Sequence, residues 1–255
     1  MIRKVSPLLP YIAWLLFSFR LHFLYNIFSR KDKNMKPKVK RTIITSIILI
    51  ISFTVWTVLI QTVDVKAVGV NSTNIGFAFV NTRFHSLTGV NFILYNITDW
   101  LGLVPLAVCL AFGILGFIQL IKRKSLFKVD ADIIILGVYY VLVILCYLVF
   151  EMIPINYRPV LIKGVMEASY PSSTTLLVLS VMPTLVFQIK HRMKNIKRQR
   201  IVTVITLFFC IFMVVGRLIS GVHWLTDIIG SVLLSAGLFY AYKSACLLRR
   251  FNYGV

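Results

Sequence analysis

The chain has 255 residues, of which 58% are hydrophobic, and a formal charge of +20. A soluble domain with this charge would suggest a nucleic-acid binder, but a chain with only 14% charged residues is too apolar for one. The apolar content also excludes intrinsic disorder, and the length and the four cysteines exclude a disulfide-stapled secreted scaffold. We therefore expect an all-α polytopic membrane protein whose charge reflects its topology.

A membrane-spanning helix needs about 20 mostly apolar residues, and six segments fulfil this requirement. They are Ile43–Val63, Trp100–Ile121, Ile133–Phe150, Thr174–Ile189, Ile201–Leu218 and Trp224–Leu247. We expect residues 43–250 to form one membrane domain. The basic segment 1–42 includes the apolar stretch Leu8–Phe28, which Arg20 and His22 interrupt. We interpret it as an interfacial or accessory segment, with a seventh span or an extension upstream of Met35 as alternatives.

The basic residues are distributed unevenly between the two sides of the predicted spans. Of the 28, 23 lie in the N-terminal segment, in the loops after the second and fourth spans, or in the C-terminal tail counted from Lys243. The other five are Lys66, Arg83, Arg158, Lys163 and Arg217. The positive-inside rule then predicts cytoplasmic termini and three outer loops. We expect a multi-pass protein of a bacterial plasma membrane that contacts anionic membrane lipids and no nucleic acid.

The cysteines indicate packing rather than chemistry. All four lie in predicted spans, where small side chains suit helix contacts: Cys109, Cys146, Cys210 and Cys246. No cysteine or histidine pair has the spacing of metal ligands, so we expect neither a metal nor another cofactor. No feature of the sequence defines an oligomeric state.

Ionisable residues at membrane depth are candidates for function, and two of them begin the sixth span. His223 and Asp227 are four residues apart, so a helix projects both from one face. A carboxylate beside an imidazole orients the ring and leaves its other nitrogen free as a base or nucleophile. The alternative interpretation is a histidine at the interface with an aspartate in the first helical turn.

Two arginines on the same predicted side point to an anionic ligand. Arg217 ends the fifth span and Arg158 lies in the neighbouring outer loop. Two guanidinium groups facing one imidazole suit a bound phosphate dianion. Ser172, Ser173 and Thr174 follow a proline at a helix start, where backbone N–H groups and hydroxyls bind phosphate oxygens or simply cap the helix.

Three short patterns together resemble the signatures of the type 2 phosphatidic acid phosphatase superfamily. They are Arg158-Pro159, Pro171-Ser172 and Arg217-x5-His223-x3-Asp227. The superfamily includes membrane lipid phosphatases and is related to bacterial acid phosphatases and vanadium haloperoxidases. The resemblance covers roughly Trp100–Leu247, with a core that starts at about residue 100.

The resemblance implies a role for each of these residues. His223 would attack phosphorus and form a phosphohistidine, and Asp227 would orient it. Arg158 and Arg217 would neutralise the phosphate oxygens, and Ser172 would help to bind them. The implied substrate is a lipid phosphate or a polyprenyl diphosphate, whose phosphate is hydrolysed or transferred at the outer membrane face.

The sequence also departs from the signatures. Glu151 stands where the superfamily has a lysine, and Thr174 stands where it has the histidine that protonates the leaving oxygen. Ser173 replaces a glycine, and Gly216 replaces a serine. Glu151 is expected to pair with Arg158 or Lys163, or to be solvated.

These departures leave three functional interpretations. Lys163 and His85 are candidates to replace the lost cation and the lost acid, although both also suit solvated loop positions. A diphosphate substrate needs no protein acid, because its leaving group is already stable. The alternative is an impaired relative that binds phospholipid or polyprenyl phosphate head groups without turnover. A transporter is disfavoured, because polar residues gather at one face rather than at the bilayer midplane.

Overall fold

The structure is a computed structural model that describes residues 37–253. The chain divides into two compact units, Met1–Arg41 and Thr42–Val255. The first unit lies almost entirely outside the described residues. The predicted interfacial segment lies there too, together with its two alternatives, a seventh span and an extension upstream of Met35. The following description concerns the second unit.

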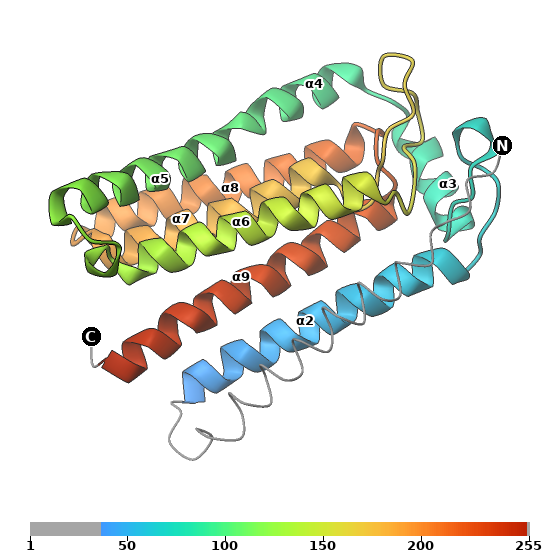
Figure 1. The fold of residues 1–255 in the computed structure, drawn as a ribbon. Helices are drawn as coiled ribbons and strands as arrows, with labels where there is room; N and C mark the ends of the chain where they lie inside the picture. The colour runs from blue at the N-terminus through green and yellow to red at the C-terminus, as the bar shows by residue number, and fades with distance from the viewer. Residues whose placement is uncertain (1–36, 254–255) are drawn as a thin grey trace. The chain divides into compact units, whose positions relative to one another are not determined.

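The described chain is helical and contains no strand, as predicted. Its elements are α2 (Pro37–Thr62), η1 (Val70–Ser72), α3 (Ala78–Thr88), α4 (Phe92–Leu101), α5 (Leu103–Arg123), η2 (Leu126–Lys128), α6 (Ala131–Met152), α7 (Ser173–Arg192), α8 (Ile196–Ile219) and α9 (Leu225–Tyr253) (Figure 1). Six helices or helix pairs are long and apolar enough to cross a membrane, and they correspond to the six predicted spans. The all-α multi-pass architecture is therefore confirmed.

The first outer loop is more ordered than the sequence predicts. The segment expected to be a loop from Asp64 to Tyr95 contains α3 and the first turn of α4. The side chain of Asn91 accepts a hydrogen bond from the N–H of Leu94 at 2.9 Å and caps α4, so the second crossing begins eight residues before Trp100. Helix α3 is short and half polar, so its composition carries no signal of a span.

The second crossing is interrupted at Gly102, between α4 and α5. Pro105 has no N–H to donate to the carbonyl of Leu101, and its ring crowds that carbonyl. The N–H of Gly102 bonds to the carbonyls of Thr98 and Asp99, at 3.1 and 3.0 Å, and so ends α4. On the N-terminal side of this break, α4 packs against α8, which brings Thr98 and Asp99 to the end of α8 that carries the candidate site.

Helix α7 packs against α5, α6, α8 and α9, and the α7–α9 pair is the most extensive contact in the unit. These two helices have the lowest hydropathy of the six crossings because their buried faces carry small polar residues. The hydroxyl of Ser231, for example, donates to the carbonyls of Asp227 and Ser172 at 2.8 and 3.0 Å. Such bonds satisfy polar groups that no water could reach in a bilayer.

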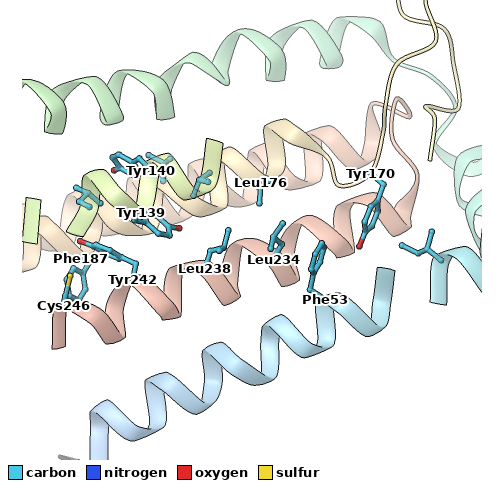
Figure 2. Close-up of a cluster of buried hydrophobic side chains, with 14 residues drawn as sticks. Phe53, Tyr139, Tyr140, Tyr170, Leu176, Phe187, Leu234, Leu238, Tyr242 and Cys246 are labelled. Carbon is cyan, nitrogen blue, oxygen red and sulfur yellow. The ribbon is translucent and has the colours of Figure 1, made fainter. Parts of the chain in front are cut away.

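Aromatic side chains fill the core between α6, α7 and α9 (Figure 2). The hydroxyls of Tyr139 and Tyr140 bond to Ser180 and Thr184 of α7, at 3.0 and 2.8 Å. Near the candidate site, Tyr170 stacks on Phe53 of α2 with ring centroids 6.1 Å apart. Buried tyrosines thus combine apolar area with a satisfied hydroxyl.

The end of the bundle opposite the candidate site is closed by ion pairs. Asp130, just before α6, pairs with Arg123 at 2.8 Å and with Arg192 at 3.0 Å. Asp132 pairs with Arg250 of α9 at 2.6 Å. These contacts gather the ends of α5, α7 and α9 on the side where most of the described basic residues lie.

Candidate active site

The loop between α6 and α7 folds back on itself and carries two site residues to the start of α7. The N–H of Arg158 bonds to the carbonyl of Glu167 at 3.1 Å, and the N–H of Ser169 bonds to the carbonyl of Asn156 at 2.9 Å. Lys163 lies at the exposed tip of this excursion with φ of 51°. No contact among the described residues brings Lys163 to His223.

The loop between α8 and α9, which holds His223, is fixed from outside by α3 and the turn after it. The N–H of Asn91 donates to the carbonyl of Ser220 at 3.0 Å. The Nε2 of His85 lies 3.1 Å from the carbonyl oxygen of Gly221, so this nitrogen carries the proton. The structure therefore places His85 behind the site loop, as a support for it.

Gly221 offers a test of this packing. Its φ is +68°, and a Cβ there would stand 1.8 Å from the carbonyl oxygen of Gly89. We expect Gly221→Ala to lower the free energy of unfolding by at least about 1–2 kcal/mol through backbone strain alone. Gly113→Ala is the matched control, because nothing lies within 4 Å of its Cβ position. Equal melting temperatures of the two variants in detergent would contradict the tight packing of this loop.

His223 and Asp227 lie on the same side of the start of α9, and a third residue stands between them. His223 Nδ1 lies 3.8 Å from Asp227 Oδ2, which is too far for a hydrogen bond. The hydroxyl oxygen of Ser169 lies 3.0 Å from that nitrogen and 2.5 Å from that oxygen. Asn156 Nδ2 and the N–H of Trp224 donate to the same carboxylate at 3.1 and 2.9 Å. All of these groups are buried, so the carboxylate is held in one position.

The two predicted arginines converge on one aromatic ring. The guanidinium carbons of Arg158 and Arg217 lie 5.7 and 4.8 Å from the ring centroid of Tyr95. Arg158 is only 7% exposed, and Arg217 is only 1% exposed. Arg158 pairs with Glu167 at 3.1 Å, and Arg217 lies 3.6 Å from Asp99. Both carboxylates are more exposed to solvent than the arginines that they pair with.

Several buried nitrogen atoms here have no partner among the described residues. They are Nε2 of His223, Nε and Nη1 of Arg158, and Nε of Arg217. Buried donors are nearly always hydrogen-bonded, so unpaired ones that belong to neighbouring residues indicate a ligand with several acceptor oxygens. A phosphate group has this chemistry and suits the planar donors of arginine.

The start of α7 lies against the same cluster, although its three side chains point to different surroundings. The N–H of Ser172 donates to the carbonyl of Asp227 at 3.4 Å, and its hydroxyl donates to Thr175 at 3.1 Å. Ser173 lines a small cavity at the end of α6. Thr174 Cγ2 would lie 3.5 Å from a Cβ on Gly102, so Thr174 lies near the α4–α5 break.

Of the two alternatives for Glu151, pairing with Arg158 or Lys163 and solvation, the structure has the second. Glu167 takes the position beside Arg158, because the folded-back loop sets these two residues opposite each other. Glu151 is exposed at the end of α6, lines the same cavity as Ser173, and forms no ion pair with another described residue.

The protonation state of His223 is a testable consequence of the geometry. Burial lowers the pKa of His223 well below its usual 6.5, and the charges of Arg158 and Arg217 lower it further. The ring should therefore remain neutral, and nucleophilic, as the pH falls from 8 to 6. NMR titration of ring-labelled histidine measures this, with His223→Ala to assign the signal. A midpoint for His223 at or above 6.5 would contradict the burial and charge that the structure gives this ring.

Sequence reasoning missed the uncharged members of the site. Ser169, Asn156 and Tyr95 carry no charge and stand at no spacing that marks them. Their proximity to His223 or the arginines arises only when the loop folds back and α4 packs against α8.

The fold and the site together define a six-crossing membrane bundle with a buried cluster of one histidine, one aspartate and two arginines at one end. Residues 138–249, which hold all four of these residues, match the model of the PAP2 superfamily, the superfamily of type 2 phosphatidic acid phosphatases. The resemblance predicted from the three short patterns is therefore confirmed.

The fold is also similar to a solved structure of a transmembrane PAP2-type phosphatidylglycerolphosphate phosphatase from Bacillus subtilis. The TM-score is 0.57, and the match covers 80% of this chain and 96% of that one. Sequence identity is 18%, so this likeness concerns the fold. No curated protein matches the chain.

Proposed function

We propose that the protein removes or transfers the phosphate of a membrane lipid phosphate or polyprenyl diphosphate. The observation that carries this proposal is the buried Nε2 of His223, which has no partner among the described residues, in a ring that lies within the electrostatic influence of Arg158 and Arg217, whose buried Nε atoms also lack one. A nucleophilic nitrogen and guanidinium donors that have no hydrogen-bond partner among the described residues suit a phosphoryl group between them. The family match supports the same chemistry on a lipid phosphate.

The proposed reaction has two steps. Nε2 of His223 attacks phosphorus while the bond from phosphorus to the leaving oxygen breaks, which yields a phosphohistidine. Water then attacks this intermediate, and phosphate leaves while His223 is restored; another acceptor in place of water would give transfer. Arg158 and Arg217 would hold the equatorial oxygens, where charge develops in the transition state.

The leaving group decides which substrates this site can use. Thr174 has a hydroxyl that cannot act as a proton donor near neutral pH, so an alkoxide leaving group would lack the acid that normally contributes about 10²- to 10⁴-fold. A diphosphate leaves as a stable phosphate anion and needs no such donor. We therefore favour lipid diphosphates over monoesters, with phosphatidylglycerol phosphate, the substrate class in the name of the Bacillus subtilis relative, as the monoester to compare.

The orientation in the membrane follows from the charge distribution. The site lies at the helix ends opposite the basic loops, so the positive-inside rule predicts an outer-face site and cytoplasmic termini in a bacterial plasma membrane. The substrate head group would then be reached from the outer leaflet.

A second candidate function is head-group binding without turnover. Thr174 in place of an imidazole favours it, because binding needs no proton donor whereas release of an alkoxide does. Binding of this kind would depend on Arg158 and Arg217 but would survive loss of His223.

A phosphate-release assay separates these functions. The purified protein is offered phosphatidate, phosphatidylglycerol phosphate and polyprenyl diphosphate, with His223→Ala in parallel. We expect release by the wild type alone, fastest from the diphosphate. Equal phosphate release by both proteins from every lipid would refute the proposed enzymatic function. Head-group binding that His223→Ala retains would then favour the second function.

A further inference from the structure

We propose that Ser169 is a positioning residue that links Asp227 to His223 and determines which ring nitrogen of the histidine carries the proton. The inference rests on the proposed function and deepens it. The residue belongs to none of the three patterns that carry the family resemblance.

The distances assign the direction of each hydrogen bond. The Ser169 hydroxyl oxygen lies 2.5 Å from Asp227 Oδ2 and 3.0 Å from His223 Nδ1. An ionised carboxylate only accepts, so the single hydroxyl proton of Ser169 is donated to Asp227. The oxygen of Ser169 must then accept from Nδ1–H, and Nε2 keeps its lone pair. This is the nitrogen that is buried without a partner among the described residues.

The surroundings prevent Asp227 from replacing Ser169 directly. Its carboxylate is held by Asn156 at 3.1 Å and by the N–H of Trp224 at 2.9 Å. Ser169 itself is 2% exposed, and its N–H is bonded to the carbonyl of Asn156 at 2.9 Å. Removal of the hydroxyl therefore leaves a gap of 3.8 Å between the carboxylate and the ring.

The link would act in the chemical step rather than in binding. When Nε2 bonds to phosphorus, the ring gains positive charge, and the Nδ1–H bond to Ser169 becomes stronger. The Asp227 carboxylate stabilises this charge through the Ser169 hydroxyl, which its hydrogen bond to Oδ2 polarises. The contribution thus appears in the transition state and the intermediate, which predicts an effect on kcat more than on KM.

Two variants of the full chain, in detergent, test this role with a chemical readout and a spectroscopic one. Ser169→Ala should lower kcat by about 10- to 100-fold with little change in KM, by analogy with the loss of a hydrogen-bond partner of a metal-bound histidine. Ser169→Thr, which keeps the hydroxyl, should restore most of the activity. In ¹⁵N NMR spectra of the imidazole ring, wild-type His223 should carry its proton on Nδ1, and Ser169→Ala should give a mixture of tautomers.

Inorganic vanadate, which bonds covalently to a nucleophile as phosphorus does, gives a readout that does not require turnover. We expect weaker vanadate binding to Ser169→Ala than to the wild type. Wild-type His223 with its proton on Nε2 would overturn the inference, and so would unchanged kcat and vanadate affinity in a folded Ser169→Ala protein. Failure of the proposed function is a different result: wild-type phosphate release that equals that of His223→Ala.

Discussion

Replacement of His223 by alanine is expected to lower phosphate release by at least about 10³-fold, because the variant lacks the atom that bonds to phosphorus. The side chain is 3% exposed and its Nε2 faces no protein partner among the described residues, so no neighbouring group is placed to substitute for it. Initial rates with the best lipid substrate, at saturating concentration, measure this loss.

His191 provides the matched control for a histidine substitution. It lies in the last turn of α7, at the opposite end of the bundle, and is exposed. His191→Ala should therefore retain the wild-type rate. If His223→Ala keeps more than a tenth of the rate that His191→Ala shows, His223 is not the nucleophile.

Substitution of Arg217 should have the next largest effect. Its guanidinium is 1% exposed, carries an unpaired Nε and lies beside the same tyrosine ring as Arg158. We expect Arg217→Ala to lower kcat/KM by about 10²- to 10³-fold, as does removal of one donor from a site where charge develops. Arg217→Lys should recover only part of this loss, because an ammonium group cannot donate as a planar fork.

The control for charge alone is Arg83, an exposed arginine of α3 on the same side of the bundle. Arg83→Ala removes one positive charge from that side without a contact to the cluster, so its kcat/KM should stay near the wild-type value. Similar losses in Arg83→Ala and Arg217→Ala would mean that Arg217 acts through long-range attraction of an anionic lipid rather than through contact with the phosphate.

The membrane architecture could be predicted from the sequence because it depends on length, apolarity and charge, which are local properties. The early start of the second crossing could not, since it depends on a cap by Asn91 and on packing of α4 against α8. The break at Gly102 follows from Pro105 only once the residues on both sides are known to be helical.

The site residues, like the helices, could be predicted only in part from the sequence. His223, Asp227, Arg158 and Arg217 could be identified because ionisable groups are rare near apolar spans. Ser169 could not, because its role depends on the 3.8 Å gap between two other side chains.

The carboxylate beside Arg158 could not be predicted either. Glu151 and Glu167 lie in the same region of the sequence. The folded-back loop, which joins the N–H of Arg158 to the carbonyl of Glu167, determines that Glu167 is the partner.

The most direct test of the central claim is to locate the phosphate on the protein during a single turnover. The wild type is mixed with a lipid phosphate or diphosphate that carries a radiolabel on the transferred phosphorus. The reaction is quenched in alkali, which preserves phosphohistidine, and the label is then located by peptide mapping. We predict an acid-labile label on Nε2 of His223, absent from His223→Ala. Wild-type protein that releases labelled phosphate without ever carrying label on His223 would contradict the account.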